Sequence, residues 1–347
     1  MNLHTFLDSL LAQLCIQTFE SSINLSNTLQ AQRSFGRTMK CLQITFFLFT
    51  LSVFCRSVQS TNPTCECGWR NRARIIGGKE TCKNEFPWMV AIGDIKNNFS
   101  QFCGGSIITP WHILTAAHCT EGKDSDDIGV IIGGHDITNL GEDTSELITI
   151  EQIVEHEDYD EIKFINDIAI LVTSEQIFLN KNVGPVCLPN KRINLVDQYV
   201  KVTGWGLTTH PGKPSSVLRQ VNLKVIPIDQ CKKDWSDISE TDPPTQLCTF
   251  RKNKDSCFQD SGGPLVWLDP DTNRFIQVAL VSYGGKCGGS RPAVNTAVFP
   301  FLEWINAHVE ETKPEAHVCM VEPISSQHQT QTGQDLSDIY SLFDTDS

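Results

Sequence analysis

Three residues in separate stretches have the side-chain types needed for nucleophilic catalysis. His118 lies in "LTAAHC", Asp167 in "NDIAILV" and Ser261 in "DSGGP". A serine hydroxyl is a weak nucleophile at neutral pH, so it needs a base to accept its proton. An imidazole base in turn needs a carboxylate to hold its tautomer and balance its charge. Each stretch alone is more often structural, but their occurrence together in the order His, Asp, Ser favours catalysis.

The elements that would position these residues are mainly β-strands. From residue 75 to residue 309 the chain alternates short β-branched and aromatic runs with Gly, Pro, Asn and Asp, as in "ELITIEQIVEH", "IAILV" and "QYVKVTGWG". This spacing predicts an all-β sandwich or barrel. In "VFPFLEWINAHVEE", Phe301, Trp304, Ile305 and Val309 recur at helical spacing. One C-terminal helix is therefore predicted.

Composition limits the class of protein. The 347 residues are 40% hydrophobic and 20% charged, which allows a core of ordinary size, and the formal net charge is -13. Nucleic-acid binding depends on clustered Lys and Arg, so this charge argues against such a partner.

The amino-terminal region has the pattern of a secretory signal. Residues 39–60 begin with Met39 and Lys40, continue with an apolar run over 42–55, and end in small residues. This predicts a signal peptide cleaved after Ser60, with residues 1–38 as an upstream extension. The alternative is a membrane-tethered protein in which residues 42–55 stay in the bilayer, although the run is shorter than the roughly 20 residues of a comfortable span.

Cysteine usage agrees with an oxidising compartment. Of fourteen cysteines, Cys15, Cys41 and Cys55 would leave with the leader, and the remaining eleven are an odd number. Disulfides persist in secreted chains, so one thiol is expected outside the intramolecular pairs. Asn98 begins an N-glycosylation sequon, which fits the same compartment.

No metal or cofactor site is predicted. Residues 269–274, "DPDTNR", imitate the start of a calcium loop, but Arg274 stands where the turn needs Gly and Leu280 where the bidentate carboxylate belongs. The nine histidines show neither HExxH nor paired Cys and His spacing.

Six short motifs between residues 75 and 309 resemble those of the trypsin/chymotrypsin family of serine endopeptidases. They are "IIGG", "LTAAHC", "NDIAIL", "VCLP", "GWG" and "DSGGP", and "CECGW", "NEFPW" and "LCTF" are similar to the insect venom serine proteases within it. The resemblance implies two six-stranded antiparallel barrels, over residues 75 to about 190 and about 191 to 300, with the active site between them. It also implies hydrolysis of peptide bonds in protein substrates.

The resemblance divides the chain into a peptidase domain and flanking segments. Residues 61–74 become a propeptide or light-chain segment, residues 75–310 the peptidase domain, and residues 311–347 a disordered acidic or polar tail. The family's activation implies cleavage after Arg74, which frees the amine of Ile75 to pair with the carboxylate of Asp260. A buried carboxylate without a partner is costly, so the new terminus would order the loop. The expected product is a secreted zymogen whose partners include an activating protease and protein inhibitors.

By the same resemblance, the catalytic residues are His118, Asp167 and Ser261, and the backbone NH groups of Gln259 and Ser261 form the oxyanion hole. The specificity pocket has Asp255 at its base. Its walls include Ser282, Gly284 and Ala293. A carboxylate at the base of a narrow slot selects a long cationic side chain, so cleavage after Arg or Lys is expected.

Four positions depart from the family pattern. Gln259 and Ala293 replace glycines, Lys286 adds a positive charge near the pocket entrance, and Gly134 stands where calcium-binding relatives have a carboxylate. Ala293 and Lys286 could weaken or shift the preference for Arg and Lys. We expect the Gln259 NH to stay in place and its side chain to limit what binds beyond the scissile bond.

The resemblance also implies three disulfides, Cys103–Cys119, Cys231–Cys248 and Cys257–Cys287. Cys187 would pair with Cys65 or Cys67, with Cys319 available to the other. Cys82 would be the odd thiol, because Gln220 occupies its usual partner position.

Two functions remain open from the sequence. The first is a secreted serine endopeptidase, supported by all three catalytic residues together with Asp255 and Arg74. The alternative is a catalytically weakened homologue that binds or regulates a partner through the same cleft, which the substitutions at Gln259 and Ala293 favour.

Overall fold

The structure, a computed structural model, describes residues 65–71, 80–139, 144–207, 212–252 and 259–321, all within the unit Cys65–Ser347. The predicted signal peptide, the Arg74–Ile75 junction, Asp255, Cys257 and residues 322–347 lie outside the described residues.

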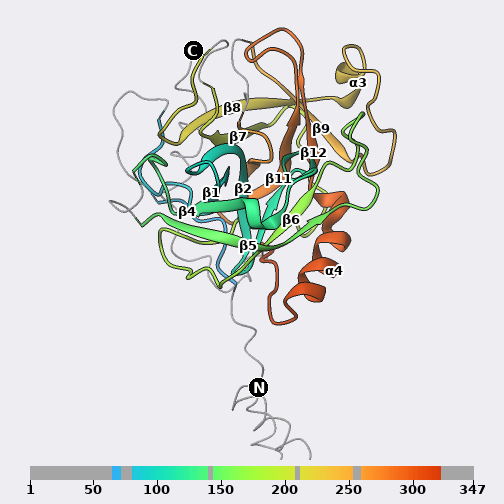
Figure 1. Cartoon of the computed structure of the whole chain (residues 1–347). Helices are drawn as coiled ribbons and strands as arrows, with labels where there is room; N and C mark the ends of the chain where they lie inside the picture. Colours follow the sequence, from blue (N-terminus) through green and yellow to red (C-terminus); the bar gives the residue numbers. More distant parts are fainter. Residues whose placement is uncertain (1–64, 72–79, 140–143, 208–211, 253–258, 322–347) are drawn as a thin grey trace, which may run out of the picture. The chain divides into compact units, whose positions relative to one another are not determined.

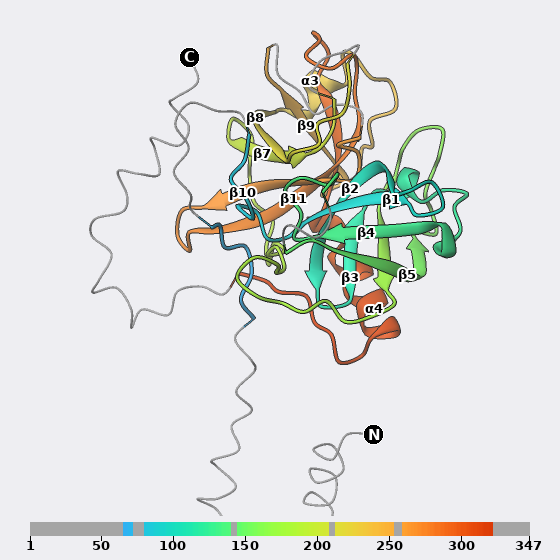
Figure 2. The same ribbon diagram turned by 60° about the vertical axis from the view of Figure 1, so that its left-hand side comes forward.

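Twelve strands form two closed antiparallel barrels (Figures 1 and 2), which confirms the predicted fold class. The strands of the first barrel are β1 (Met89–Asp94), β2 (Ser100–Thr109), β3 (His112–Thr115), β4 (Ile128–Ile132), β5 (Glu146–Glu155) and β6 (Ala169–Thr173). Those of the second are β7 (Tyr199–Gly204), β8 (Arg219–Ile226), β9 (Gln246–Phe250), β10 (Pro264–Asp269), β11 (Arg274–Tyr283) and β12 (Ala293–Ala297). The neighbour order is β1-β2-β3-β6-β5-β4 in the first and β7-β8-β9-β12-β11-β10 in the second, so the two barrels repeat one topology.

Short helical segments connect or end the strands. They are η2 (Ala117–Cys119), η3 (Ser125–Asp127), α3 (Ile228–Cys231), η4 (Phe299–Phe301) and α4 (Leu302–Thr312). Among the described residues, no helix has the length and apolar character required to cross a membrane.

Strand sequences match their burial. β4 ("IGVII") and β6 ("AILVT") are apolar and buried along their whole length. β5 instead buries Ile148 and Ile150 while the residues between and before them are exposed, which is the period of two expected of a strand with one solvated face.

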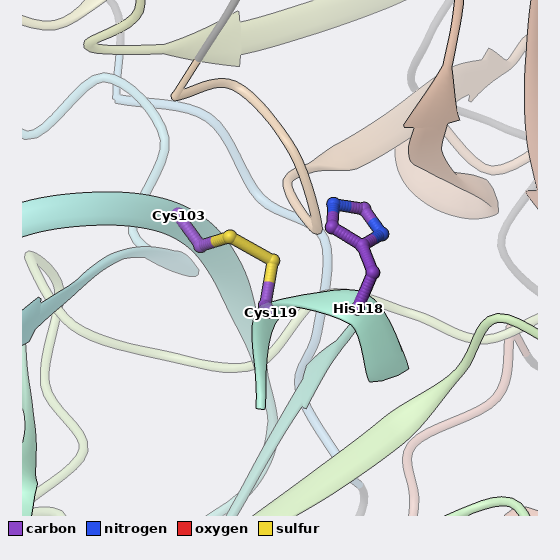
Figure 3. A group of neighbouring side chains, drawn as sticks. All are labelled: Cys103, His118 and Cys119. Atoms are coloured by element: carbon purple, nitrogen blue, oxygen red, sulfur yellow. A yellow bond between two sulfur atoms is a disulfide. The ribbon is translucent and has the colours of Figure 1, made fainter. Parts of the chain in front are cut away.

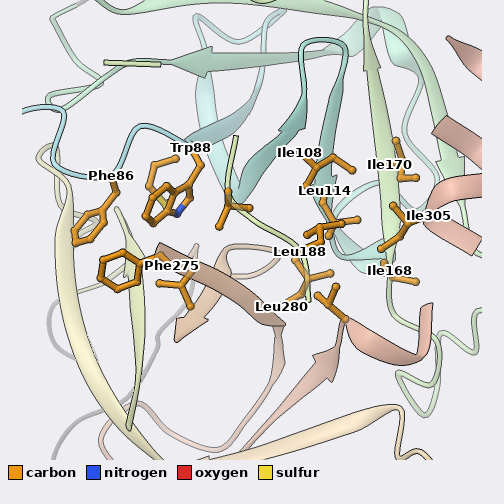
Figure 4. Close-up of a cluster of buried hydrophobic side chains, with 14 of the residues drawn as sticks. Phe86, Trp88, Ile108, Leu114, Ile168, Ile170, Leu188, Phe275, Leu280 and Ile305 are labelled. Carbon is orange, nitrogen blue, oxygen red and sulfur yellow. The ribbon is translucent and has the colours of Figure 1, made fainter. Parts of the chain in front are cut away.

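Buried hydrophobic clusters fill each barrel and join the two. One fills the first barrel around Ile107, Ile113 and Ile128, and another fills the second around Val200 and Leu223. A third joins residues from both barrels and from α4, with Phe86, Trp88 and Phe275 in mutual ring contact at one end of it (Figure 4). Because this cluster is common to both barrels, it sets how their loops meet.

Helix α4 is the predicted C-terminal helix, and it packs on the first barrel rather than the second (Figures 1 and 2). Ile305 and Val309 are buried in the cluster that contains Ile168 and Ile170 (Figure 4). The chain after the helix remains ordered to Val321, since Met320 bridges in parallel to Leu188. Residues 311–321, predicted from the sequence to lie in the polar tail, therefore include the end of α4 and this bridge.

Two disulfides attach the segment before the predicted cleavage point to the peptidase domain. Cys65 pairs with Cys319, and Cys67 pairs with Cys187. The backbone NH of Gly68 also donates to the Pro185 carbonyl at 2.9 Å. Of the two arrangements left open by the sequence, the structure has Cys67 on Cys187.

His112 links β3 to α4 through a buried imidazole. Its Nδ1 lies 2.6 Å from Thr109 Oγ1 and its Nε2 lies 2.8 Å from Thr312 Oγ1, and the side chain is fully buried. Burial, with the nearby Lys313 charge as a smaller cause, lowers the pKa of His112 to about 4.

This pKa predicts an acid-sensitive contribution to stability. In the unfolded chain His112 has an ordinary pKa near 6.5, whereas in the folded protein it stays neutral to a lower pH. As pH falls, the unfolded chain therefore binds a proton on His112 before the folded protein does. The free energy of unfolding is therefore unaffected by protonation of His112 above pH 6.5, and it falls by up to ~3 kcal/mol as pH decreases to about 4. Denaturant unfolding at a series of pH values should give a flatter profile for His112→Asn over this range, and parallel profiles would contradict the assignment.

Candidate active site

His118 is positioned by a one-turn segment that a disulfide ties to β2. It lies in η2, directly after β3, with Ala117 and Cys119 buried on either side. The Cys103–Cys119 disulfide joins this segment to β2, and the imidazole projects from the same turn (Figure 3). The side chain is 18% exposed, so the ring is sheltered but reachable.

Asp167 is fully buried and accepts three hydrogen bonds. Its Oδ1 accepts the backbone NH of His118 at 2.9 Å, and its Oδ2 lies 2.8 Å from His118 Nδ1. The Ser282 hydroxyl donates to the same Oδ2 at 2.5 Å. A carboxylate buried in this way is tolerated only with such partners. With the proton on Nδ1 held by Asp167, Nε2 of His118 is left to act as a base.

Ser282 has a role that the sequence did not predict. The resemblance assigned it to a pocket wall, whereas its hydroxyl contacts the carboxylate beside His118. A second missed neighbour is Phe164, whose ring packs edge-on against the His118 imidazole with centroids 5.6 Å apart. Neither residue lies in a catalytic motif, so pattern analysis offered no signal for them.

Ser261 lies in a turn, residues 259–263, that reaches across to the first barrel. Its carbonyl accepts the Gly104 NH of β2 at 2.8 Å, and the Gly262 NH donates to Val281 of β11 at 2.8 Å. Gly262 has φ +73°, and a Cβ there would collide with Thr115 and Ala116. Only glycine lets the turn press against the residues that lead directly to His118. The structure thus brings the Ser261 turn and the His118 segment together.

The Asp260 carboxylate lies against the "GWG" stretch. Its Oδ1 accepts the Gly206 NH at 2.9 Å, and a Cβ on either Gly204 or Gly206 would overlap the carboxylate. The glycines are therefore required by the close approach of Asp260. Its predicted partner, Ile75, lies outside the described residues.

Two predicted pocket residues face each other. Gly284 follows β11 and Ala293 begins β12, and the Ala293 Cβ lies 3.5 Å from where a Cβ on Gly284 would stand. This is an ordinary van der Waals distance, so the Ala293 methyl lies directly opposite Gly284. Asp255, the predicted base of this pocket, lies outside the described residues.

Gln259 adopts φ 75° and turns its side chain toward β2. Its Nε2 donates to the Gln101 carbonyl at 3.0 Å, and Gln101 Nε2 donates back to the Gln259 carbonyl at 3.0 Å. Gln101 was not among the predicted site residues, because a lone glutamine in a strand carries no recognisable motif.

Cys103, His118 and Cys119 place two sulfur atoms and a ring nitrogen within 4.8 Å of one another (Figure 3). The sulfurs are joined in a disulfide and so cannot act as thiolate ligands. The group is a covalent brace beside the histidine, and within the described ranges no other cluster of this kind occurs.

The remaining cysteines follow the family pattern. Cys231 pairs with Cys248, and Cys287 is disulfide-bonded, although its predicted partner Cys257 lies outside the described residues. Cys82 is buried, and the Glu85 carboxylate accepts both its backbone NH at 2.9 Å and the Gln220 Nε2 at 3.5 Å. Gln220 therefore does lie near Cys82, as the resemblance implied.

Comparison with known proteins agrees with this geometry. A sequence model of the family Trypsin matches residues 75–305. A venom serine protease of Polistes dominula is 37% identical over 281 residues, covering 79% of this chain and 98% of its own. Venom serine protease 34 of Apis mellifera is 35% identical, covering 77% of this chain and 65% of its own. The proclotting enzyme of Tachypleus tridentatus is 32% identical, covering 70% and 68%.

The family match covers most of the chain, and the barrels place His118 and Asp167 against the turn that carries Ser261. The chain therefore belongs to the trypsin family and is a serine endopeptidase.

Proposed function

We propose that the chain is the secreted zymogen of an endopeptidase that is activated by cleavage after Arg74 and then hydrolyses peptide bonds after Arg or Lys. The observation that supports this most directly is the Asp167 carboxylate, which is buried and bonded to both the backbone and the ring of His118. A histidine held in one tautomer beside a serine turn is the arrangement needed for acyl transfer.

The proposed chemistry uses two half-reactions. Ser261 Oγ attacks the scissile carbonyl carbon while its proton passes to His118 Nε2, and the carbonyl electron pair moves to the oxygen. The NH groups of Gln259 and Ser261 stabilise that oxyanion. His118 then protonates the leaving amine as the C–N bond breaks, and water hydrolyses the acyl-enzyme by the same steps. Asp167 offsets the imidazolium charge throughout and remains ionised.

Substrate choice is proposed to depend on Asp255 below the Gly284 and Ala293 walls. The Ala293 methyl adds one carbon to the slot opposite Gly284, and we expect a long unbranched cationic side chain to pass it. Burying the substrate cation against Asp255 avoids an unpaired buried charge.

Activation is proposed to act through Asp260. The Gly206 NH donates to the Asp260 carboxylate, and Gly204 and Gly206 leave room for it beside the end of β7, where the Ile75 ammonium would pair with it after cleavage. The two disulfides from Cys65 and Cys67 would keep the segment before Arg74 attached after cleavage. Disulfide pairing on this scale also supports secretion.

The alternative of a noncatalytic homologue is less well supported. Such a protein would have no need to keep a carboxylate at this buried position bonded to both the backbone NH and the ring of His118, because that carboxylate serves mainly to orient the histidine.

Replacing the nucleophile should abolish turnover. In the chain cut after Arg74, Ser261→Ala should lower kcat for an arginine amide substrate by about 10⁵-fold or more. His118→Ala should cost a similar amount, and the double variant little beyond either one, since the residues act as a unit. Equal rates for wild type and Ser261→Ala would refute the proposed catalysis.

The pocket assignment predicts a change of specificity. Asp255→Ser should reduce kcat/KM for arginine and lysine substrates roughly 10²- to 10⁴-fold, because the substrate cation would be buried unpaired. Substrates with an apolar side chain at the cleaved residue should be unaffected or improved. A uniform loss on both substrate classes would instead indicate damage to the fold.

Cleavage and tethering can be tested on one sample. Arg74→Gln should leave the chain inactive after treatment with an arginine-specific protease, whereas the treated wild type gains activity and a new amino terminus at Ile75. On a nonreducing gel the cut wild type should keep its light segment and lose it only with reductant. Release without reductant would contradict the disulfide assignment.

A further inference from the structure

Gln259 has a backbone conformation that its side chain does not favour. A φ of 75° lies in the left-handed region, where a residue with a Cβ pays roughly 1–2 kcal/mol. Of the other described non-glycine residues with positive φ, most are Asn or Asp, whose short side chains tolerate it. Glutamine lacks that tolerance, so something else must hold Gln259 in this state.

The holding interaction is a reciprocal amide pair, formed by Gln101 and Gln259. Each side-chain amide donates to the backbone carbonyl of the other residue at 3.0 Å. Gln101 Nε2 also donates to the Cys103 carbonyl at 3.0 Å, and Gln101 is only 9% exposed. With two acceptors for one buried NH₂ group, the Gln101 side chain is restricted to a single orientation.

Gln101, one member of the pair, lies in the strand that anchors the catalytic histidine. Gln101 lies in β2, two residues before Cys103, whose disulfide leads to Cys119 and thus to His118. The Gly104 NH of this strand holds the Ser261 carbonyl. One strand therefore fixes the segment of the base, the nucleophile turn and Gln259.

The pair also determines where the Gln259 NH points. A peptide group is planar, so anchoring the Gln259 carbonyl orients the plane that follows this residue. With that plane anchored and ψ unchanged, relaxation of φ from 75° to an ordinary value near −60° would rotate the NH about the N–Cα bond by well over 100°. The NH would then no longer face the same point in the cleft.

An unsatisfied hydrogen-bond acceptor on the same residue is consistent with this role. Gln259 Oε1 is buried and has no hydrogen-bond partner among the described residues. Leaving a buried acceptor unsatisfied costs about 1–3 kcal/mol. The side chain is thus held for its Nε2 donor and not for its oxygen.

We propose that Gln101 is a positioning residue for the transition state: the reciprocal amide pair keeps Gln259 at positive φ, so that its NH remains directed at the oxyanion. This rests on the proposed function, in which that NH is an oxyanion donor. It also revises the role expected for the Gln259 side chain, which is bonded to β2.

The test compares one substitution in two backgrounds of the chain cut after Arg74. Gln101→Met keeps the volume of the side chain and removes both donors. With Gln259 present it should lower kcat by about 10- to 10³-fold with little change in KM, since losing one oxyanion donor costs up to that amount. In the Gln259→Gly background, where positive φ carries no penalty, the same substitution should change kcat less than about threefold.

Two further measurements separate positioning from simple destabilisation. A peptide aldehyde forms a bond from Ser261 Oγ to its carbonyl carbon and places an oxyanion in the same site, so its inhibition constant should rise with the loss in kcat. Gln246→Met removes a buried amide of β9, whose Oε1 accepts the Ser239 NH at 2.9 Å, and should affect stability but not kcat.

The outcomes are distinct. Wild type no faster than Ser261→Ala would end the proposed function itself. An active wild type with Gln101→Met equally impaired in both backgrounds, or unimpaired in both, would overturn the positioning role. If Gln101→Met fails to fold, the isosteric Gln101→Glu, which also lacks the donors, takes its place in the same cycle.

Discussion

The buried carboxylate of Asp167 is the constraint around which the site is organised. Its three donors come from both barrels, two from the His118 segment and one from Ser282 at the end of β11. Removing a carboxylate from water is favourable only when its hydrogen-bonding capacity is filled. The barrels must therefore meet in one arrangement for this group to be satisfied, and that arrangement also delivers the nucleophile turn.

The arrangement of the site also requires backbone segments to approach one another closely. Gly262 lets the Ser261 turn touch Thr115 and Ala116, and Gly204 and Gly206 leave room for the Asp260 carboxylate. Gln259 also has a positive φ, although it is not a glycine. Its conformation is held by hydrogen bonds to Gln101 on β2, so the rigidity of the turn depends on a side chain in the other barrel.

Hydrophobic packing and a disulfide make these contacts depend on one another. The cluster that contains Phe86, Trp88 and Phe275 joins the barrels, and α4 packs on the first barrel through Ile305 and through the contact of Thr312 with His112. The Cys103–Cys119 disulfide joins the strand that carries Gln101 to the turn that carries His118. A disturbance in β2 would thus reach the base and the nucleophile turn together.

The sequence by itself determined the strand-rich fold and the C-terminal helix, and it predicted His118, Asp167 and Ser261 as the catalytic residues. Strand period, helical spacing and contiguous motifs are local patterns, and a local pattern can be recognised without knowing what packs against it. Ser282, Phe164 and Gln101 could not be found in this way. Their roles arise from contacts across 115, 46 and 158 positions respectively, which exist only once the barrels close and pack. Tertiary structure decided them because a hydrogen bond depends on where two atoms meet, not on how far apart they lie in the chain.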